Sequence, residues 1–496
     1  MSRASFQTLL AGPFLVLSAS AAVTPSVASA QPAAVDRCYT CHLEVESPEA
    51  MKFEHDVHYQ KGVRCSDCHG GDPTAEDQDE GMNPAKGYRG AIRKSQIPEI
   101  CGQCHGAEDN PFKRRFELTN VVDSLFASAH GEAFRANADG PQCVSCHGAH
   151  DITGVKDSRS PVHPSRVAQT CASCHSDARY MRKFNPGLPV DQHTKYLTSV
   201  HGRRNAKGDP KPATCVSCHS NHMVLKGKDP RSPVYPTRIP EMCGKCHSDE
   251  KYMAQYEIPT DQLSNYKQSL HGIALLEKSD LNAPACNSCH GNHGAAPPGA
   301  ASVVAVCGNC HQSNEELYEK SAHKDVFAKK KLSGCVVCHS NHLIKAATDE
   351  LVSFAPPSPC ADCHTRDASD TAAPAILRIR SLLDSLQVGQ REALERLDQA
   401  EQLGMDVADT RYDLKDANQA LVMSRVAIHS FKVEELAEVA RPGIAVIAAA
   451  KASGSAAVRE YFFRRQGLAV STLIVTLLAI VLYLKIRQID KEAKKR

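Results

Sequence analysis

The chain has 496 residues, of which 23% are charged and only 5% are aromatic, and its formal net charge is +2. With so small a net charge, and with Lys and Arg spread along the chain, no nucleic-acid partner is expected. With no tryptophan and few other aromatic side chains, a chain of this length is poorly supplied for an ordinary hydrophobic core.

The N-terminus has the features of a secretory signal peptide. Arg3 supplies a positive charge, an apolar stretch covers residues 9–23, and Ala-Ser-Ala at 28–30 fits the small-residue pattern of a cleavage site. The apolar stretch is short and contains a proline, which argues against a buried helix or a membrane anchor. We therefore expect residues 1–30 to be removed on export.

The motif Cys-x-x-Cys-His occurs eleven times after this segment, and its copies use all 22 cysteines. No thiol is left for a disulfide, a separate zinc site or a nucleophile. The motif is typical of covalent haem attachment, in which both thiols become thioethers and the following His reaches the iron. A zinc knuckle or a redox pair would explain one copy, but not eleven copies that each carry the His. We therefore predict eleven covalent c-type haems, which would also supply the missing apolar interior, so that folding requires the cofactor.

Each motif assigns two attachment cysteines and one proximal iron ligand. The attachment pairs are Cys38 and Cys41, Cys65 and Cys68, Cys101 and Cys104, Cys143 and Cys146, Cys171 and Cys174, Cys215 and Cys218, Cys243 and Cys246, Cys286 and Cys289, Cys307 and Cys310, Cys335 and Cys338, and Cys360 and Cys363. The proximal ligands are His42, His69, His105, His147, His175, His219, His247, His290, His311, His339 and His364.

A longer unit repeats along the motifs: Ser-x-His, about a dozen residues, CxxCHxxH, about twenty residues, and a second CxxCH. We number its copies 1 to 5, and name the His of Ser-x-His the leading His, the last His of CxxCHxxH the trailing His, and the two CxxCH sequences the first and second motifs. Copy 1 is looser, with two histidines before Cys65 and Asp72 in place of the trailing His, and the Cys38 motif stands ahead of all five copies. The copies cover about 50–105, 128–175, 199–247, 269–311 and 321–364.

The additional histidines suit haem irons that have a His on both faces. A trailing His follows the proximal His of its own motif by three residues, so we expect it to ligate the haem of another motif. The candidate distal ligands are His55, His58, His130, His150, His201, His222, His271, His293, His323, His342 and His429.

His429 supplies the eleventh of these distal ligands, and alternatives remain for that position. They are His163, His193, Met51, or water at a reactive iron. Sister copies carry Tyr and Leu where His163 and His193 stand, which argues against these two histidines as ligands.

From Ala372 onward Cys and His nearly vanish, and apolar residues recur at helical spacing. We expect one helix to end near Gly404 and a second to be broken at Pro442-Gly443. This region, 371–465, is either a plain helical stalk or a hairpin that packs on the haem region and delivers His429.

Residues 467–484 contain no charged side chain and are long enough for one bilayer crossing. More Lys and Arg follow this segment than precede it, which predicts a cytoplasmic C-terminus. We expect a transmembrane helix over 467–486, a basic cytoplasmic tail over 487–496, and the haem region, 31–370, on the periplasmic side of the inner membrane.

The loops between the motifs are rich in Pro, Gly, Asp and Lys, and no strand pattern occurs. The expected fold is mainly irregular chain with short α-helices wrapped around eleven covalent haems, followed by a C-terminal α-helical hairpin or bundle and one transmembrane helix. Little or no β-sheet is expected.

Over about residues 38–364 the motifs and interleaved histidines resemble those of multihaem cytochromes c. The repeated unit is similar to that of periplasmic cytochromes that relay electrons, among them small tetrahaem cytochromes and membrane-anchored quinol-oxidising ones. The sequence SRVAIHS around His429 resembles the C-terminal helical bundle of pentahaem nitrite reductases and octahaem hydroxylamine oxidoreductases, in which a helix His can ligate a haem. Two features depart from these families: every motif here ends in His where nitrite reductases carry one CxxCK, and the apolar anchor is C-terminal rather than N-terminal.

This resemblance implies a membrane-anchored periplasmic cytochrome that relays electrons along bis-His haems in respiratory or anaerobic electron transport, without a substrate site or catalytic residue of its own. Its expected partners are the bilayer and other redox proteins, either a membrane quinone-reactive subunit or a periplasmic cytochrome. The alternative is an oxidoreductase that acts on a small nitrogen or sulfur oxyanion at one haem with an open axial site. The Cys38 haem is the first candidate for that site if His429 is not a ligand. A polymerising filament is disfavoured by the C-terminal span.

Overall fold

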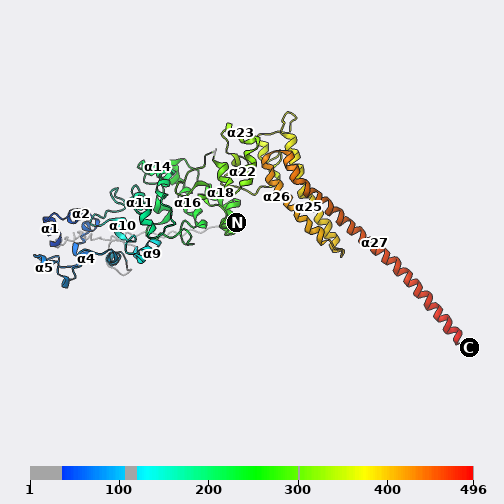
Figure 1. Cartoon of the computed structure of the whole chain (residues 1–496), viewed down its shortest axis with the longest axis horizontal. Coiled ribbons are helices and arrows are strands. Elements are labelled where there is room, and N and C mark those ends of the chain that lie inside the picture. Colours follow the sequence, from blue (N-terminus) through cyan, green and yellow to red (C-terminus); the bar gives the residue numbers. More distant parts are fainter. Residues whose placement is uncertain (1–35, 107–119, 300–301, 495–496) are drawn as a thin grey trace, which may run out of the picture. The chain divides into compact units, whose positions relative to one another are not determined.

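The computed structural model describes residues 36–106, 120–299 and 302–494, and in these ranges every regular element is a helix (Figure 1). The expected mixture of short helices and irregular chain, without β-sheet, is confirmed for this part of the chain. The expected signal peptide lies outside the described residues. The chain divides into two compact units, Met1–Asn120 with Pro141–Pro161 and Val121–Gly140 with Val162–Arg496.

The first unit is built from short helices joined by turns. They are α1 (Arg37–Glu44), α2 (Pro48–Phe53), α3 (Val57–Gln60), α4 (Cys65–His69), α5 (Gln78–Gly81), the 3-10 turns η1 (Pro84–Lys86) and η2 (Lys94–Gln96), α6 (Ile97–His105) and α10 (Cys143–His147).

The second unit continues in the same way through the remaining motifs. Its shorter elements are α8 (Val122–Phe126), α9 (Ala129–Ala136), α11 (Val167–His175), α12 (Ala178–Arg182), α13 (Gln192–Thr198), α14 (Val200–Ala206), α15 (Cys215–His219), η3 (Pro236–Arg238), α16 (Ile239–His247), α17 (Glu250–Met253), η4 (Ala254–Tyr256), α18 (Gln262–Gln268), α19 (Leu270–Gly272), the π-turn η5 (Ile273–Glu277), α20 (Cys286–His290), α21 (Val303–Gly308), α22 (Gln312–Glu319), α23 (Ala322–Lys329), α24 (Gly334–His339), η6 (Asp349–Leu351) and η7 (Pro359–Asp362). Three long helices follow: α25 (Ala373–Gln402), α26 (Ala408–Ala427) with the turn η8 (Ile428–Ser430), and α27 (Val433–Ala493).

In three of the four Ser-x-His sequences, the Ser caps the start of the helix that carries the leading His. Ser128, Ser199 and Ser269 are buried N-caps whose hydroxyls accept a hydrogen bond from the backbone N–H three residues later, at 3.1, 2.8 and 3.0 Å. Such a cap satisfies a helix N–H that would otherwise lack a partner. In copy 1 Asp56 takes this position and accepts from the N–H of His58 at 2.8 Å. The leading His of copy 1 is therefore His58 rather than His55.

Neighbouring copies are joined by one recurring backbone hydrogen bond. The donor is the backbone N–H of the residue just before the leading His. The acceptor is a backbone carbonyl in the next copy, on the residue two positions after the trailing His. The bonds are Val57 to Ile152 at 2.7 Å, Ala129 to Val224 at 2.9 Å, Val200 to Ala295 at 3.0 Å and Leu270 to Ile344 at 2.8 Å. The leading segment of one copy therefore lies against the trailing segment of the next.

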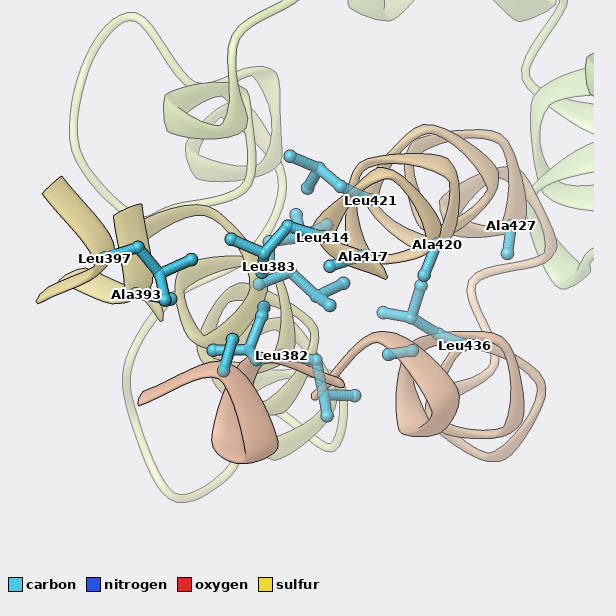
Figure 2. Close-up of a cluster of buried hydrophobic side chains, with 14 of the residues drawn as sticks. Leu382, Leu383, Ala393, Leu397, Leu414, Ala417, Ala420, Leu421, Ala427 and Leu436 are labelled. Carbon is cyan, nitrogen blue, oxygen red and sulfur yellow. The ribbon is translucent and has the colours of Figure 1, made fainter. Parts of the chain in front are cut away.

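The three long helices pack on one another, and Figure 2 shows their leucines and alanines pointing into a common core. Leu383, Leu386 and Leu397 of α25 are completely buried there, as is Leu436 of α27. This core is much larger than the small apolar clusters among the motifs, so this part of the chain folds around its own side chains.

The expected break at Pro442-Gly443 is wrong. The chain turns earlier, at Phe431, which has a φ of 55°, and α27 then runs through Pro442 without interruption. A Cβ atom at position 443 would lie 2.5 Å from that of Ala420, so the glycine allows α27 to approach α26. Residues on one face of α27 are buried both before and after Pro442. The free energy gained from this burial outweighs the loss of the backbone hydrogen bond that Pro442 cannot make.

Beyond the bundle, α27 continues past the ends of α25 and α26 (Figure 1). Its apolar part reaches a mean hydropathy of 2.5 over an 18-residue window, and none of that window is buried. The helix is long and apolar enough to cross a membrane.

Shortening a completely buried leucine should weaken the bundle. We expect Leu386→Ala to cost about 2–5 kcal/mol, because it removes buried methyl groups and leaves a cavity. A lower urea midpoint of the helical circular dichroism signal would measure this loss. Leu377→Ala on the same helix is the control, since Leu377 is 50% exposed and should shift the midpoint little. Equal shifts for the two variants would contradict this packing.

Candidate haem sites

The cysteine motifs form two structural classes. First motifs occupy a single helical turn, as in α4, α10, α15 and α20, and the residue after the proximal His has a positive φ of 65 to 81°. Second motifs end longer helices such as α6, α11 and α16, and the residue after the His has a φ near −100°. The positive φ turns the chain away from the proximal His and directs the trailing His elsewhere. The positive-φ residues are Gly70, Gly148, Ser220, Gly291 and Ser340.

Each leading His faces the proximal His of the second motif in its own copy. The ring centroids of His58 and His105 lie 6.2 Å apart, and those of His130 and His175 lie 6.1 Å apart. The same pairing recurs in the other three copies, at 6.1 Å for His201 and His247, 6.3 Å for His271 and His311, and 6.2 Å for His323 and His364.

Three of the four trailing histidines face the first motif of the preceding copy. His150 lies 5.9 Å from His69, His293 lies 6.1 Å from His219, and His342 lies 5.9 Å from His290, measured between ring centroids. His429 takes the same place after copy 5, with its ring 6.1 Å from that of His339. Trailing histidines therefore lie opposite another motif, as the repeat predicts.

These nine separations fit a metal atom between the two rings. A metal–imidazole nitrogen bond is about 2 Å long, so two such bonds and the two ring radii separate the centroids by about 6 Å. The observed range of 5.9 to 6.3 Å therefore leaves room for a haem iron with one His on each face. The residues present fit the cofactor that the cysteines imply.

Comparisons with known proteins agree with this geometry. The family model of cytochrome c7 and related cytochrome c matches residues 51–148, and the model of cytochrome c554 and c-prime matches residues 18–70. A curated relative, the C-type polyheme cytochrome OmcC of Geobacter sulfurreducens, is 26% identical over 186 residues, which are 32% of this chain and 23% of that protein. No solved structure matches the chain.

The chain is a multihaem c-type cytochrome. Covalent haem c is accordingly its cofactor. The long apolar helix suits an anchor in a bilayer.

Successive attachment sites of the cytochrome lie next to each other within each unit. The first cysteine of a second motif contacts the first cysteine of the following first motif, and a hydrogen bond between these thiols raises the pKa of Cys101 before haem is attached. These pairs are Cys101 and Cys143, Cys171 and Cys215, Cys243 and Cys286, and Cys307 and Cys335. Because the thioethers join the edge of the porphyrin, adjacent cysteines bring neighbouring haem edges close together.

Hydrogen bonds to Nδ1 orient several of the imidazoles. His58 bonds to the Asp56 carboxylate at 2.9 Å, His69 to the Gly90 carbonyl at 2.9 Å, and His364 to Asp370 at 3.1 Å. With Nδ1 bonded in this way, Nε2 is directed toward the iron. Asp56 and Asp370 were not identified from the sequence as partners of these imidazoles. Asp56 could have been found, because it stands where the other copies have the Ser of Ser-x-His.

Burial lowers the pKa of several other paired imidazoles and so favours the neutral form that can bind iron. It lowers the pKa of His130 to about 4, with the neighbouring His175 as a smaller cause. Burial is also the largest cause of the lowered pKa of His201, His339 and His429. A neutral imidazole has a free lone pair with which it can bind a metal.

The helical bundle positions His429 beside copies 4 and 5 of the repeat. The Nδ1 atom of His429 lies 2.9 Å from the Val426 carbonyl, and the Asn314 amide on α22 lies 3.2 Å from both ring nitrogens. Arg425 makes a two-pronged ion pair at 2.9 Å with the buried Asp349 in η6. Of the two interpretations of this region, the geometry favours a bundle that packs on the haem region.

Some predicted site residues are not brought together with a partner. His55 is exposed, with its Nε2 atom 3.4 Å from a carboxylate oxygen of Glu54. His163 bonds to the Ser165 hydroxyl at 2.7 Å. Among the residues described, no proximal His ring faces His163 or His193.

Removing His429 should leave one haem iron without its second imidazole. We expect His429→Ala to convert one low-spin haem per chain to the high-spin state, because His339 alone would hold the iron of the Cys335 haem. Electron paramagnetic resonance of the oxidised protein measures this change. His193→Ala is the matched control and should leave the spectrum unaltered. A spectrum of His429→Ala identical to that of the wild type would exclude His429 as a ligand.

Proposed function

We propose that this cytochrome carries eleven covalent haems and relays electrons along them on the periplasmic side of the inner membrane, in respiratory or anaerobic electron transport. The observation that carries the proposal is a contact that recurs within the units, in which the first cysteine of a second motif lies against the first cysteine of the next first motif. Electrons move between haems whose edges are close, so such a series supports transfer over a distance that one haem cannot cover.

The pairing of histidines supports a relay rather than substrate chemistry. Nine proximal histidines face a second His at about the separation that an iron bound on both sides requires. An iron with two imidazole ligands has no position for a substrate and changes oxidation state with little movement of its ligands. The partners that this chemistry requires are an electron donor and an electron acceptor, which we expect to be a membrane quinone-reactive subunit and a periplasmic redox protein.

Electron counting tests the relay. We expect the purified protein in detergent to take up eleven electrons per chain from a low-potential donor and to release them to an added acceptor. Turnover of nitrite, hydroxylamine or sulfite should stay at the level of a heat-denatured control. Sustained consumption of any of these compounds would show that the protein is an oxidoreductase with its own substrate.

Truncation tests the anchor. A chain that ends after Arg465 lacks the apolar part of α27 but keeps every motif and the buried part of the bundle. We expect this variant to keep its haem spectrum and to move from the membrane fraction to the soluble periplasmic fraction. A conservative control, Leu477→Ile, should remain in the membrane fraction. A truncated chain that still sediments with membranes would require another means of attachment.

A further inference from the structure

The Cys38 motif, which precedes the repeat, takes the place of a second motif. Its helix α1 packs against α4, as the second-motif helices α6 and α16 pack against α10 and α20. The pKa of the Cys65 thiol is raised by burial, by Asp36 and, as a smaller cause, by the neighbouring Cys38 thiol. The helix also continues through His42 to Glu44, without the positive φ that follows the His of every first motif.

This assignment explains why copy 1 has no trailing His. A trailing His faces the first motif of the preceding copy. Ahead of copy 1 there is only the Cys38 motif, which takes the place of a second motif, so there is no first motif there for a trailing His of copy 1 to face. Asp72 stands in that place and instead accepts hydrogen bonds from the N–H and hydroxyl of Thr74, at 2.9 and 2.7 Å, and from Lys86 at 3.1 Å.

A second motif takes its distal ligand from the leading His of its own copy, and the Cys38 motif has none. Residues 1–37 contain no histidine, and all 24 histidines of the chain lie in residues that the structure describes. Among those residues, no other imidazole faces the exposed ring of His42. All five second motifs within the repeat have a leading His about 6 Å away.

The remaining histidines that could take this position have other places, and Met51 lies on α2 with 47% of its surface exposed. His55 points into solvent, with 61% of its side chain exposed, and pairs with Glu54. The buried Asp56 caps α3 and bonds to His58, which makes His58 the leading His of copy 1. His222 occupies a trailing position, and its counterparts in the described pairs face first motifs.

We propose that His42 alone holds the iron of the Cys38 haem and that the sixth position takes a small ligand from solution. The ligand class is a compact σ-donor: carbon monoxide or nitric oxide on the reduced iron, and cyanide, nitrite or water on the oxidised iron. This inference rests on the proposed haem at Cys38, which mass spectrometry of the peptide that contains Cys38 and Cys41 tests separately.

Carbon monoxide is the probe, because an iron with two firmly bound imidazoles does not take it up. We expect the reduced full-length protein in detergent to bind one carbon monoxide per chain, measured by titration of the Soret difference spectrum. Binding should fall to zero in Cys38→Ser/Cys41→Ser and persist in the matched control Cys360→Ser/Cys363→Ser. No uptake by the wild type, or uptake that persists without the Cys38 haem, would overturn the proposal.

Two single substitutions keep the test decisive if a cysteine variant does not mature. His42→Gln retains both thioethers and should shift the C–O stretching frequency of the complex, since the ligand lies opposite residue 42; an unchanged frequency would overturn the proposal. His55→Ala should leave the stoichiometry at one. A wild type that binds none, together with a His55→Ala variant that binds one, would show instead that His55 closes this iron.

Discussion

The separation of about 6 Å between two imidazoles from different segments is the constraint on which the haem region depends. Each such pair can bind one iron only if the backbone brings both rings into place. The buried Ser caps, the positive φ after each first motif and the backbone bonds between copies all serve this placement. Since the rings contact iron rather than each other, the cofactor completes the contacts that hold successive copies together.

The two kinds of histidine pairing have different roles in the repeat. In the proposed relay, a leading His would bind the second haem of its own copy and a trailing His would bind the first haem of the copy before it, which links neighbouring copies as in other repeat proteins. The same linkage places attachment cysteines of successive motifs in contact. Folding and electron relay therefore follow from one arrangement. Only the C-terminal bundle, with its large apolar core, has the means to fold without haem.

Much of this arrangement could be predicted from the sequence, because covalent attachment and the repeat both leave fixed spacings. The motifs identified the cofactor, and the phase of the extra histidines indicated ligands shared between motifs. Backbone acceptors such as the Gly90 carbonyl could not be predicted, since every residue carries a carbonyl and only the fold selects one. The predicted helix break at Pro442 was wrong because the low helix propensity of proline was outweighed by the burial of residues before and after it.

The two ends of the repeat are completed differently, as is common for terminal units of repeat proteins. After copy 5 no further copy supplies a trailing His, and η8 places His429 opposite His339 instead. Ahead of copy 1 the Cys38 motif stands without a leading His, and no described imidazole faces His42. The three-helix bundle thus places a second imidazole opposite the last first-motif His, whereas the residues that the structure describes include no equivalent for His42. The unequal ends place any exchange with small molecules at the N-terminal motif and leave the remaining haems to carry electrons.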